Sequence, residues 1–274
     1  MTRWLVNGVA DALVAPTDRG LLYGDGLFET IAFHNGRSRL WPLHMARLAE
    51  GCRRLDLPPP DSNLLANESQ ILLDGAARAM IRLGITRGSG GQGYFPPARP
   101  VPTRILIRRE FPADIALQRE LGVAMRTSPV RLAAGPPATA PLGGIKHSNR
   151  LEQVLIASGC RENAADEALV LDTEGMIVEG LSGNLVVVRD DQMIAPGPHP
   201  AAVAGVGLEW LRRAAGRDLG ERPFAAAQLH GGDALWVINS IRGPCRVRVL
   251  DGRELAPDSM LCEWQRRWRE EIEK

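Results

Sequence analysis

The chain has a single internal lysine, and its rarity marks it for chemistry. The 274 residues include 33 Lys and Arg residues, of which only two are Lys: Lys146 and the C-terminal Lys274. Arginine stays protonated and cannot act as an amine nucleophile, whereas a buried lysine can lose its proton and form a Schiff base with a carbonyl compound. The alternative is a surface lysine that was retained by chance, and composition alone leaves both interpretations open.

The surroundings of Lys146 suit a reactive side chain. It follows Gly143-Gly144-Ile145 at the end of a Pro- and Gly-rich stretch, 135–144, and precedes apolar residues at helical spacing. Stretches rich in Pro and Gly form loops that cross the surface or border a cleft. The amine is therefore expected at the edge of a cleft.

Three other segments suggest parts of a cofactor site, although each has an ordinary structural alternative. Glu179 follows a predicted strand, and a carboxylate beside a pyridinium nitrogen keeps such a ring protonated. Residues 204–207, Ala-Gly-Val-Gly, precede a predicted helix, whose first N–H groups favour phosphate. The Gly-rich segment Arg87–Tyr94 allows close approach of the backbone to a ligand. The alternatives are a charge at a strand end, a plain turn and a surface loop.

In their order and spacing these segments resemble the fold-type IV pyridoxal-phosphate enzymes, which include D-amino-acid and branched-chain aminotransferases and 4-amino-4-deoxychorismate lyase. The resemblance extends over about residues 4–245. It rests on DRG…YGDGLFET, on His44 with Arg47-Leu48, on TRGSGGQGY, GIKHSNRLEQVL and DEALVLD…EG, and on the turn at Gly205. Arg87–Tyr94 and Gly144–Leu155 are most similar to the lyase.

The resemblance implies pyridoxal 5′-phosphate as cofactor and assigns residues to it. Lys146 matches the Schiff-base lysine, Glu179 the carboxylate at the pyridine nitrogen, and Arg47 the arginine that binds the phosphate. The remaining cofactor contacts that it implies are the backbone at Val206 and Gly207, Ser240 at the phosphate, and Asn149 with Arg150 at the ring.

The resemblance also implies a substrate site and a partner. Arg87 and Arg104 are predicted to bind substrate carboxylates, and Tyr23 and Thr30 to lie near the substrate. Members of the group are typically homodimers with the active site near the partner subunit. A homodimer acting on a small molecule is therefore expected.

The predicted activity is that of a lyase in folate synthesis, which converts 4-amino-4-deoxychorismate to 4-aminobenzoate and pyruvate. Lys146 would take the proton from the substrate carbon that bears the amine and supply a proton to the leaving group. The alternative is an aminotransferase of the same fold acting on D-amino acids, branched-chain amino acids or (R)-amines. The pairs His147-Ser148 and Ser240-Ile241 differ from the aminotransferase pattern.

The elements that must position these residues are predicted from hydrophobic periodicity and turn signals. The pattern indicates an α+β fold with a small N-terminal α/β domain, 1–118, and a larger C-terminal domain, 119–274, which carries the lysine and has a mainly antiparallel β core. Predicted strands are 3–9, which leads into a turn at Asn7-Gly8, and 27–34, 38–41, 81–86, 103–109, 122–127, 168–171, 176–178, 184–188, 193–195 and 235–240. Predicted helices are 43–56, 65–83, 206–216 and 258–272, the last with Trp264 and Trp268 in an apolar stripe expected to pack into the core.

Composition excludes several classes of protein. The net charge is +1, without a basic excess that would favour nucleic-acid binding. No apolar run approaches the roughly 18 residues of a membrane helix, and no signal peptide is recognisable. The four cysteines are far apart in the sequence, so neither a disulfide framework nor a metal site is expected, and a cytoplasmic location fits.

Overall fold

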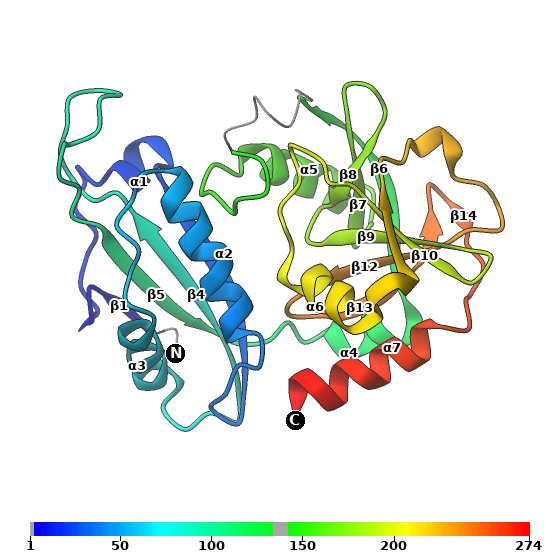
Figure 1. Ribbon diagram of the computed structural model, residues 1–274, viewed down its shortest axis with the longest axis horizontal. Helices are drawn as coiled ribbons and strands as arrows, with labels where there is room; N and C mark the ends of the chain where they lie inside the picture. Colours follow the sequence, from blue (N-terminus) through cyan, green and yellow to red (C-terminus); the bar gives the residue numbers. More distant parts are fainter. Residues whose placement is uncertain (1–2, 134–141) are drawn as a thin grey trace. The chain divides into compact units, whose positions relative to one another are not determined.

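The computed structural model describes residues 3–133 and 142–274, and the chain forms two compact units (Figure 1). The first unit comprises Met1–Phe111 with Ile145–Asn149 and Ile272–Lys274, and the second comprises Pro112–Gly144 with Arg150–Glu271. The change of unit at residue 111 falls near the predicted boundary of 118/119. The segment that contains Lys146, however, groups with the first unit rather than the second. Residues 135–141 of the predicted loop lie outside the described residues.

The first unit is an antiparallel five-stranded sheet in the order β2-β1-β5-β4-β3. The elements are β1 (Trp4–Val6), β2 (Val9–Ala10), α1 (Arg19–Tyr23), β3 (Gly26–His34), α2 (Trp41–Arg54), α3 (Ser62–Leu73), β4 (Arg78–Thr86) and β5 (Thr103–Arg109). Helices α2 and α3 cover one face of the sheet (Figure 1).

Strand β3 shows how the alternation of its residues divides them between the two faces of this sheet. Leu27, Ile31 and Phe33 are buried in the core beneath α2 and α3. Successive side chains of a strand point to opposite faces. Phe28 and Thr30 therefore lie on the face opposite the helices, and Glu29 lies on the helix face.

Two predicted elements of this unit are wrong. The helix expected over 65–83 ends at Leu73, and 78–86 form β4, which contains the strand predicted over 81–86. Asp74 and Gly75 have φ angles of 49° and 73°, a left-handed turn that ends α3, and the apolar residues after it follow a strand period. The strand expected over 38–41 does not form, because Trp41 starts α2 with a proline in its first turn.

The second unit is built on a mixed sheet whose main path runs β11-β10-β9-β12-β13-β6-β7-β8, with β14 paired to β13. Its strands are β6 (Val123–Leu132), β7 (Glu167–Asp172), β8 (Ile177–Gly180), β9 (Asn184–Arg189), β10 (Gln192–Pro196), β11 (Leu219–Arg222), β12 (Ala234–Asn239), β13 (Gly243–Leu250) and β14 (Arg253–Glu254). Its helices are α4 (Ile115–Leu121), α5 (Leu151–Glu162), α6 (Val206–Ala215) and α7 (Leu261–Trp268). The pairs β10–β11, β6–β13 and β6–β7 are parallel and the other pairs are antiparallel, as predicted in the main.

Both faces of this sheet are covered. One core contains Met125, Leu185 and Phe224, and a second contains Val170 together with Ile156 of α5. On α7, Trp264 and Trp268 are buried, and both rings meet the ring of Trp210 edge-on, which confirms that the tryptophan stripe packs into the core.

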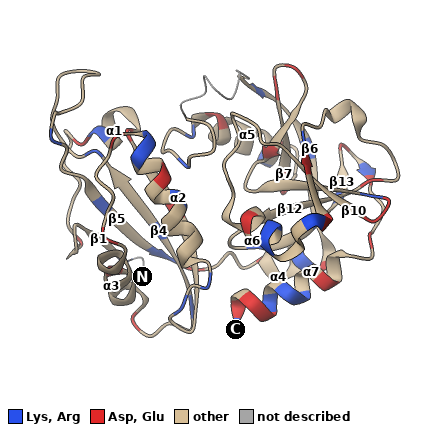
Figure 2. Ribbon diagram, in the orientation of Figure 1, with Lys and Arg blue, Asp and Glu red and all other residues tan. Residues whose placement is uncertain are grey.

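Charged residues of both signs are interspersed over the two units (Figure 2). Helix α7 and the turn that follows it carry Arg266 and Arg267 paired with Glu263, Glu270 and Glu271. Within 3–133 and 142–274 no helix is long and apolar enough to cross a membrane.

Candidate active site

Lys146 is held at the edge of the sheet of the first unit by strand-like pairing. The Phe28 amide donates to the Lys146 carbonyl at 3.0 Å, and the Ser148 amide donates to the Gly26 carbonyl at 2.9 Å. Because β3 is the outermost strand of this sheet, the segment that carries the lysine continues the hydrogen-bonded ladder. The backbone of β3 therefore fixes the stretch of chain from which the Lys146 side chain extends.

A second cation shares an aromatic ring with Lys146. The Lys146 Nζ lies 4.5 Å from the centroid of the Phe28 ring, and the Arg82 guanidinium carbon lies 3.9 Å from it. Arg82 stands directly opposite Thr30 in the β3–β4 ladder. Among the described residues Arg82 has no carboxylate partner, and burial together with the charge of Arg109 lowers its pKa. A half-buried cation without a counter-ion is suited to bind an anion.

Neither Phe28 nor Arg82 is marked as a site residue by its sequence context alone. The alternation in 27–34 places Phe28 and Thr30 on one face, but only the strand register brings Arg82 beside them. That register depends on the turns and on β4, part of which was predicted as helix.

On the helix face of the same sheet, Glu29 accepts hydrogen bonds from two residues of α2. Arg47 donates from Nε to Oε1 at 2.8 Å and from Nη2 to Oε2, and His44 Nδ1 lies 2.6 Å from Oε2. The Glu29 side chain is 1% exposed and that of His44 is fully buried. The spacing of His44 and Arg47, i and i+3, places both on the same side of α2. Arg47, predicted to bind phosphate, is thus held in place by Glu29.

The charges of this cluster are set by mutual contact. Burial alone would raise the pKa of Glu29, but the charge of Arg47 and the hydrogen bonds from His44 and Arg47 hold that pKa at about 2. Burial lowers the pKa of His44, and the charges of Arg47 and Lys146 lower it further against the opposing effect of Glu29. His44 is therefore neutral near pH 7, and its Nε2, buried without a hydrogen-bond partner among the residues that the structure describes, carries a lone pair.

In the second unit the side chains of Glu179 and Asn184 both hydrogen-bond to the backbone of Val203. Glu179 is on β8, and its Oε2 accepts from the Val203 amide at 3.0 Å. Asn184, the first residue of β9, donates to the Val203 carbonyl at 2.9 Å. Both contacts fix the residues just before α6. The carboxylate predicted to bind the pyridine nitrogen is thus held beside the segment predicted to bind phosphate.

The start of α6 packs so closely on its neighbours that larger residues would not fit. A Cβ on Gly207 would lie 2.8 Å from the Asn239 carbonyl carbon, and one on Gly205 would lie 1.7 Å from the Asn184 Oδ1. Gly205 is the N-cap of α6 and has no side chain with which to cap this end. Gly207 thus brings the first turn of α6 against Asn239, which directly precedes Ser240. The N–H groups at the start of a helix suit a phosphate.

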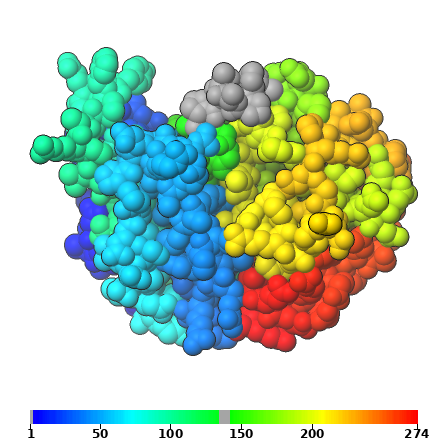
Figure 3. Space-filling model, viewed as in Figure 1, coloured from blue at the N-terminus to red at the C-terminus, as the bar shows by residue number. Residues whose placement is uncertain are grey.

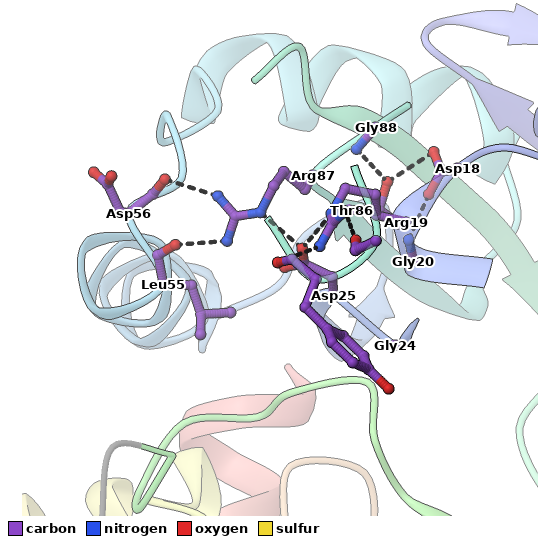
Figure 4. Close-up of polar contacts among 12 residues, drawn as sticks. Asp18, Arg19, Gly20, Gly24, Asp25, Leu55, Asp56, Thr86, Arg87 and Gly88 are labelled. Atoms are coloured by element: carbon purple, nitrogen blue, oxygen red, sulfur yellow. Dashed lines mark hydrogen bonds and ion pairs between the residues drawn. The ribbon is translucent and has the colours of Figure 1, made fainter. Parts of the chain in front are cut away.

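Two arginines predicted to bind substrate make ion pairs within the first unit. Arg87 is buried, and its guanidinium donates to the Asp25 carboxylate and to the carbonyls of Leu55 and Asp56 at the end of α2 (Figure 4). Arg104 pairs with the buried Glu68 at 2.7 Å. A role in binding substrate remains a prediction for both, and it would require these contacts to open.

The Gly-rich segment after Arg87 is a hairpin that projects from the first unit (Figure 3, blue-green). Gln92 and Phe95 exchange two backbone hydrogen bonds, and Arg19 donates to the Gly93 carbonyl while it pairs with Asp25. The Tyr23 ring lies 5.6 Å from the Tyr94 ring. Tyr23 thus supports the hairpin.

Asn149 is placed at a turn of the first unit. Its side chain donates to the Gly24 carbonyl at 3.1 Å. Gly24, at a φ of 64°, ends α1 with no room for a Cβ beside Asn149. A contact of Asn149 with the cofactor ring remains a prediction.

Comparison with known proteins identifies the family. The family model for class IV amino-transferases matches residues 26–250. The aminodeoxychorismate lyase of Vibrio harveyi is 30% identical over 253 residues, which cover 91% of this chain and 92% of the relative. The chain belongs to the class IV aminotransferase family.

Other members of the class IV family agree in sequence and structure. The crystal structure of 4-amino-4-deoxychorismate lyase from Pseudomonas aeruginosa matches with a TM-score of 0.90 and 36% identity, and the alignment covers 99% of this chain and 100% of that one. A bifunctional aminodeoxychorismate lyase / D-amino acid transaminase of Mycobacterium tuberculosis is 27% identical over 263 residues, 89% of this chain and 88% of the relative. The predicted fold-type IV architecture and the predicted family are confirmed.

Proposed function

We propose that this class IV enzyme is a lyase that converts 4-amino-4-deoxychorismate to 4-aminobenzoate and pyruvate. The observation that carries the proposal is the similarity, over at least nine tenths of the chain, to two proteins named as this lyase, at 30% and 36% identity. The lone internal lysine and the neighbouring Arg82 provide groups suited to a substrate with an amine and carboxylates.

Pyridoxal 5′-phosphate is the cofactor that the family and the residues support. Lys146 is the amine that would hold it covalently, and Glu179 the carboxylate for its ring nitrogen. The start of α6, formed by Val206 and Gly207, and the turn at Ser240 would hold the phosphate, with Gly207 packed directly on the Asn239 backbone beside that turn. When bound, the cofactor withdraws electrons from the substrate carbon that carries the amine and makes its C–H bond acidic.

The residues of the chain then perform the proton transfers. Lys146 Nζ takes the proton from the amine-bearing ring carbon. The bond between the neighbouring carbon and the enolpyruvyl oxygen breaks as the ring becomes aromatic. Lys146 returns a proton to the departing fragment, which becomes pyruvate. Arg82 would hold a substrate carboxylate through charge-assisted hydrogen bonds and keep the ring carbon within reach of Lys146.

A second candidate is an aminotransferase of the same fold acting on D-amino acids, branched-chain amino acids or (R)-amines. The bifunctional relative favours keeping it, since its name joins the two activities. Both reactions begin with proton removal by the lysine, so the same residues serve both. They differ in whether an amino donor leaves its nitrogen on the cofactor.

The two candidates are separated by product analysis. The protein loaded with pyridoxal phosphate is incubated with freshly generated 4-amino-4-deoxychorismate, and 4-aminobenzoate and pyruvate are measured together. Equal amounts of both, absent without protein, are expected. No product from the loaded protein, together with conversion of the cofactor to its amine form by D-alanine or a branched-chain amino acid, would favour the aminotransferase.

A further inference from the structure

A buried carboxylate lies behind the turn that contains Ser240. Glu167, the first residue of β7, is fully buried. Its Oε1 accepts from the Ser182 hydroxyl and from Arg242 Nη1 at 3.1 Å, and its Oε2 accepts from the Ser182 amide at 3.2 Å. Buried carboxylates are costly unless they are paired and hydrogen-bonded, as this one is. Glu167 therefore fixes Ser182 and Arg242 together.

Asn239 links Ser182 to the turn. Its Nδ2 donates to the Ser182 carbonyl at 3.1 Å, and its Oδ1 accepts from the amides of Ile241 and Arg242 at 3.0 and 2.7 Å. These contacts close the hairpin between β12 and β13 around Ser240. The turn is thus tied to Glu167 twice, through Arg242 and through Ser182 with Asn239.

The carbonyls of the same turn are held from another side. Arg119 of α4 donates to the carbonyls of Ile241 and Arg242. The amides and carbonyls of Ile241 and Arg242 are thus both engaged, which holds the turn in place, and Gly207 of α6 packs on Asn239 beside it. A phosphate between the α6 start and Ser240 would depend on that orientation, because hydrogen bonds to it need fixed donors.

We propose that Glu167 is a positioning residue for the phosphate of the cofactor, acting through Ser182, Arg242 and Asn239 on the Ser240 turn. The inference rests on the cofactor assignment of the proposed function. In this role Glu167 affects binding of the phosphate group and does not affect binding of the pyridine ring. Removal of the Glu167 carboxylate should therefore weaken the binding of pyridoxal phosphate. The binding of pyridoxal, which has the same ring and aldehyde without the phosphate, should be unaffected.

The test compares dissociation constants for pyridoxal phosphate and pyridoxal, measured by absorbance titration of the full chain. In Glu167→Gln the affinity for pyridoxal phosphate should fall about tenfold, as for other partners that orient a ligand-binding group, and the affinity for pyridoxal should change less than about twofold. Ser182→Ala, at an exposed residue, should show the same selectivity to a smaller degree. This second variant keeps the test decisive where Glu167→Gln does not fold.

The matched control is Asp233→Asn. Asp233 is also a buried carboxylate paired with an arginine, Arg189. It directly precedes the first residue of β12, whereas Asn239 is the last residue of that strand. Its removal should lower stability without changing the ratio of the two affinities. An unchanged ratio in both Glu167→Gln and Ser182→Ala would overturn the inference while the cofactor assignment stands. A wild-type protein without any preference for the phosphate form would overturn both.

Discussion

The amine of Lys146 is the reactive group that the proposed chemistry needs, and the chain provides an internal control for it. Lys146→Arg keeps the positive charge but removes the nucleophile, so lyase turnover should fall at least about 1000-fold. Lys274→Arg, at the only other lysine, should leave turnover unchanged. Formation of 4-aminobenzoate is the measurement. Borohydride reduction of the loaded protein should attach the cofactor to a Lys146 peptide, and attachment at Lys274 would contradict the assignment.

Arg82 should contribute to substrate binding at the expense of stability. Since the half-buried guanidinium has no counter-ion among the described residues, Arg82→Gln should raise the free energy of unfolding slightly. The same change should lower kcat/KM about 100-fold, mainly through KM, because a substrate carboxylate loses its partner. Cofactor affinity should stay the same.

Arg104→Gln is the matched variant for Arg82→Gln. Arg104 is paired with the buried Glu68, so its loss should lower stability and leave KM nearly unchanged. Steady-state kinetics and urea unfolding of both variants give the comparison. If KM rises in Arg104→Gln and not in Arg82→Gln, the assignment from the sequence resemblance is the better one.

Individual site residues could be predicted from the sequence where a residue type is rare or where a local motif marks it. Lys146 stands out because Arg replaces Lys elsewhere, and Glu179 and Arg47 follow from the resemblance. The partners of these residues did not follow. Glu29 meets Arg47 through the docking of α2 on β3, and Arg82 meets Phe28 through cross-strand register, so neither contact has a signal along the chain.

At the scale of elements, the Glu29 cluster joins α2 to β3 and should make this junction sensitive to acid. The pKa of Glu29 is about 2 in the fold against an ordinary value of 4.5. The folded chain thus takes up this proton less readily than the unfolded chain. The stabilisation is complete above about pH 4.5 and is lost as the pH falls through about 2, a change of roughly 3 kcal/mol.

Urea unfolding between about pH 6 and pH 2 checks this expectation. The difference in unfolding free energy between wild type and Glu29→Gln should shrink as the pH falls through the window set by the two pKa values. Glu50→Gln, at an exposed carboxylate on the same helix, should show almost no such change. A difference for Glu29→Gln that stays constant with pH would contradict the expectation.

Two helical glycines should respond in opposite ways to the same substitution. Gly207→Ala places a methyl group 2.8 Å from the Asn239 backbone, so it should destabilise the second unit by about 1–3 kcal/mol and weaken binding of pyridoxal phosphate. Gly159→Ala in α5 meets nothing within 4 Å and should raise stability by up to about 1 kcal/mol. Thermal unfolding with and without cofactor measures both. Equal changes in stability for Gly207→Ala and Gly159→Ala would show that the packing of α6 on the Asn239 backbone does not require a glycine at position 207.

Most strands and helices could be predicted because their periods are regular, as in β5 and α6. Prediction was wrong where one apolar segment suits both periods, as in 65–83, and only the left-handed turn at Asp74-Gly75 decides the outcome. The parallel pairing of strands such as β6 and β7 was not predicted either, because the pairing partner of a strand depends on the packing of the whole sheet and not on the sequence of either strand alone.

For the whole molecule, we expect a homodimer, and helix α5 gives a physical reason for it. Ile156 and Cys160 are buried beneath the helix, whereas Leu151, Val154 and Leu155 at spacings of three and four residues are 72%, 58% and 54% exposed. An apolar stripe on the outer face of a helix usually marks an interface, since its exposure to water is unfavourable. A second copy of the chain is the partner that the family resemblance implies.

Val154→Glu places a charge in the middle of this stripe and should shift the protein from dimer to monomer in sedimentation velocity runs at micromolar concentration. The control Leu117→Glu changes a comparably exposed leucine on α4 and should leave the dimer intact. Both residues lie on helix surfaces, so neither change should alter the fold of its unit. A wild-type protein that sediments as a monomer, or a dimer that survives Val154→Glu and dissociates with Leu117→Glu, would place the subunit contact away from α5.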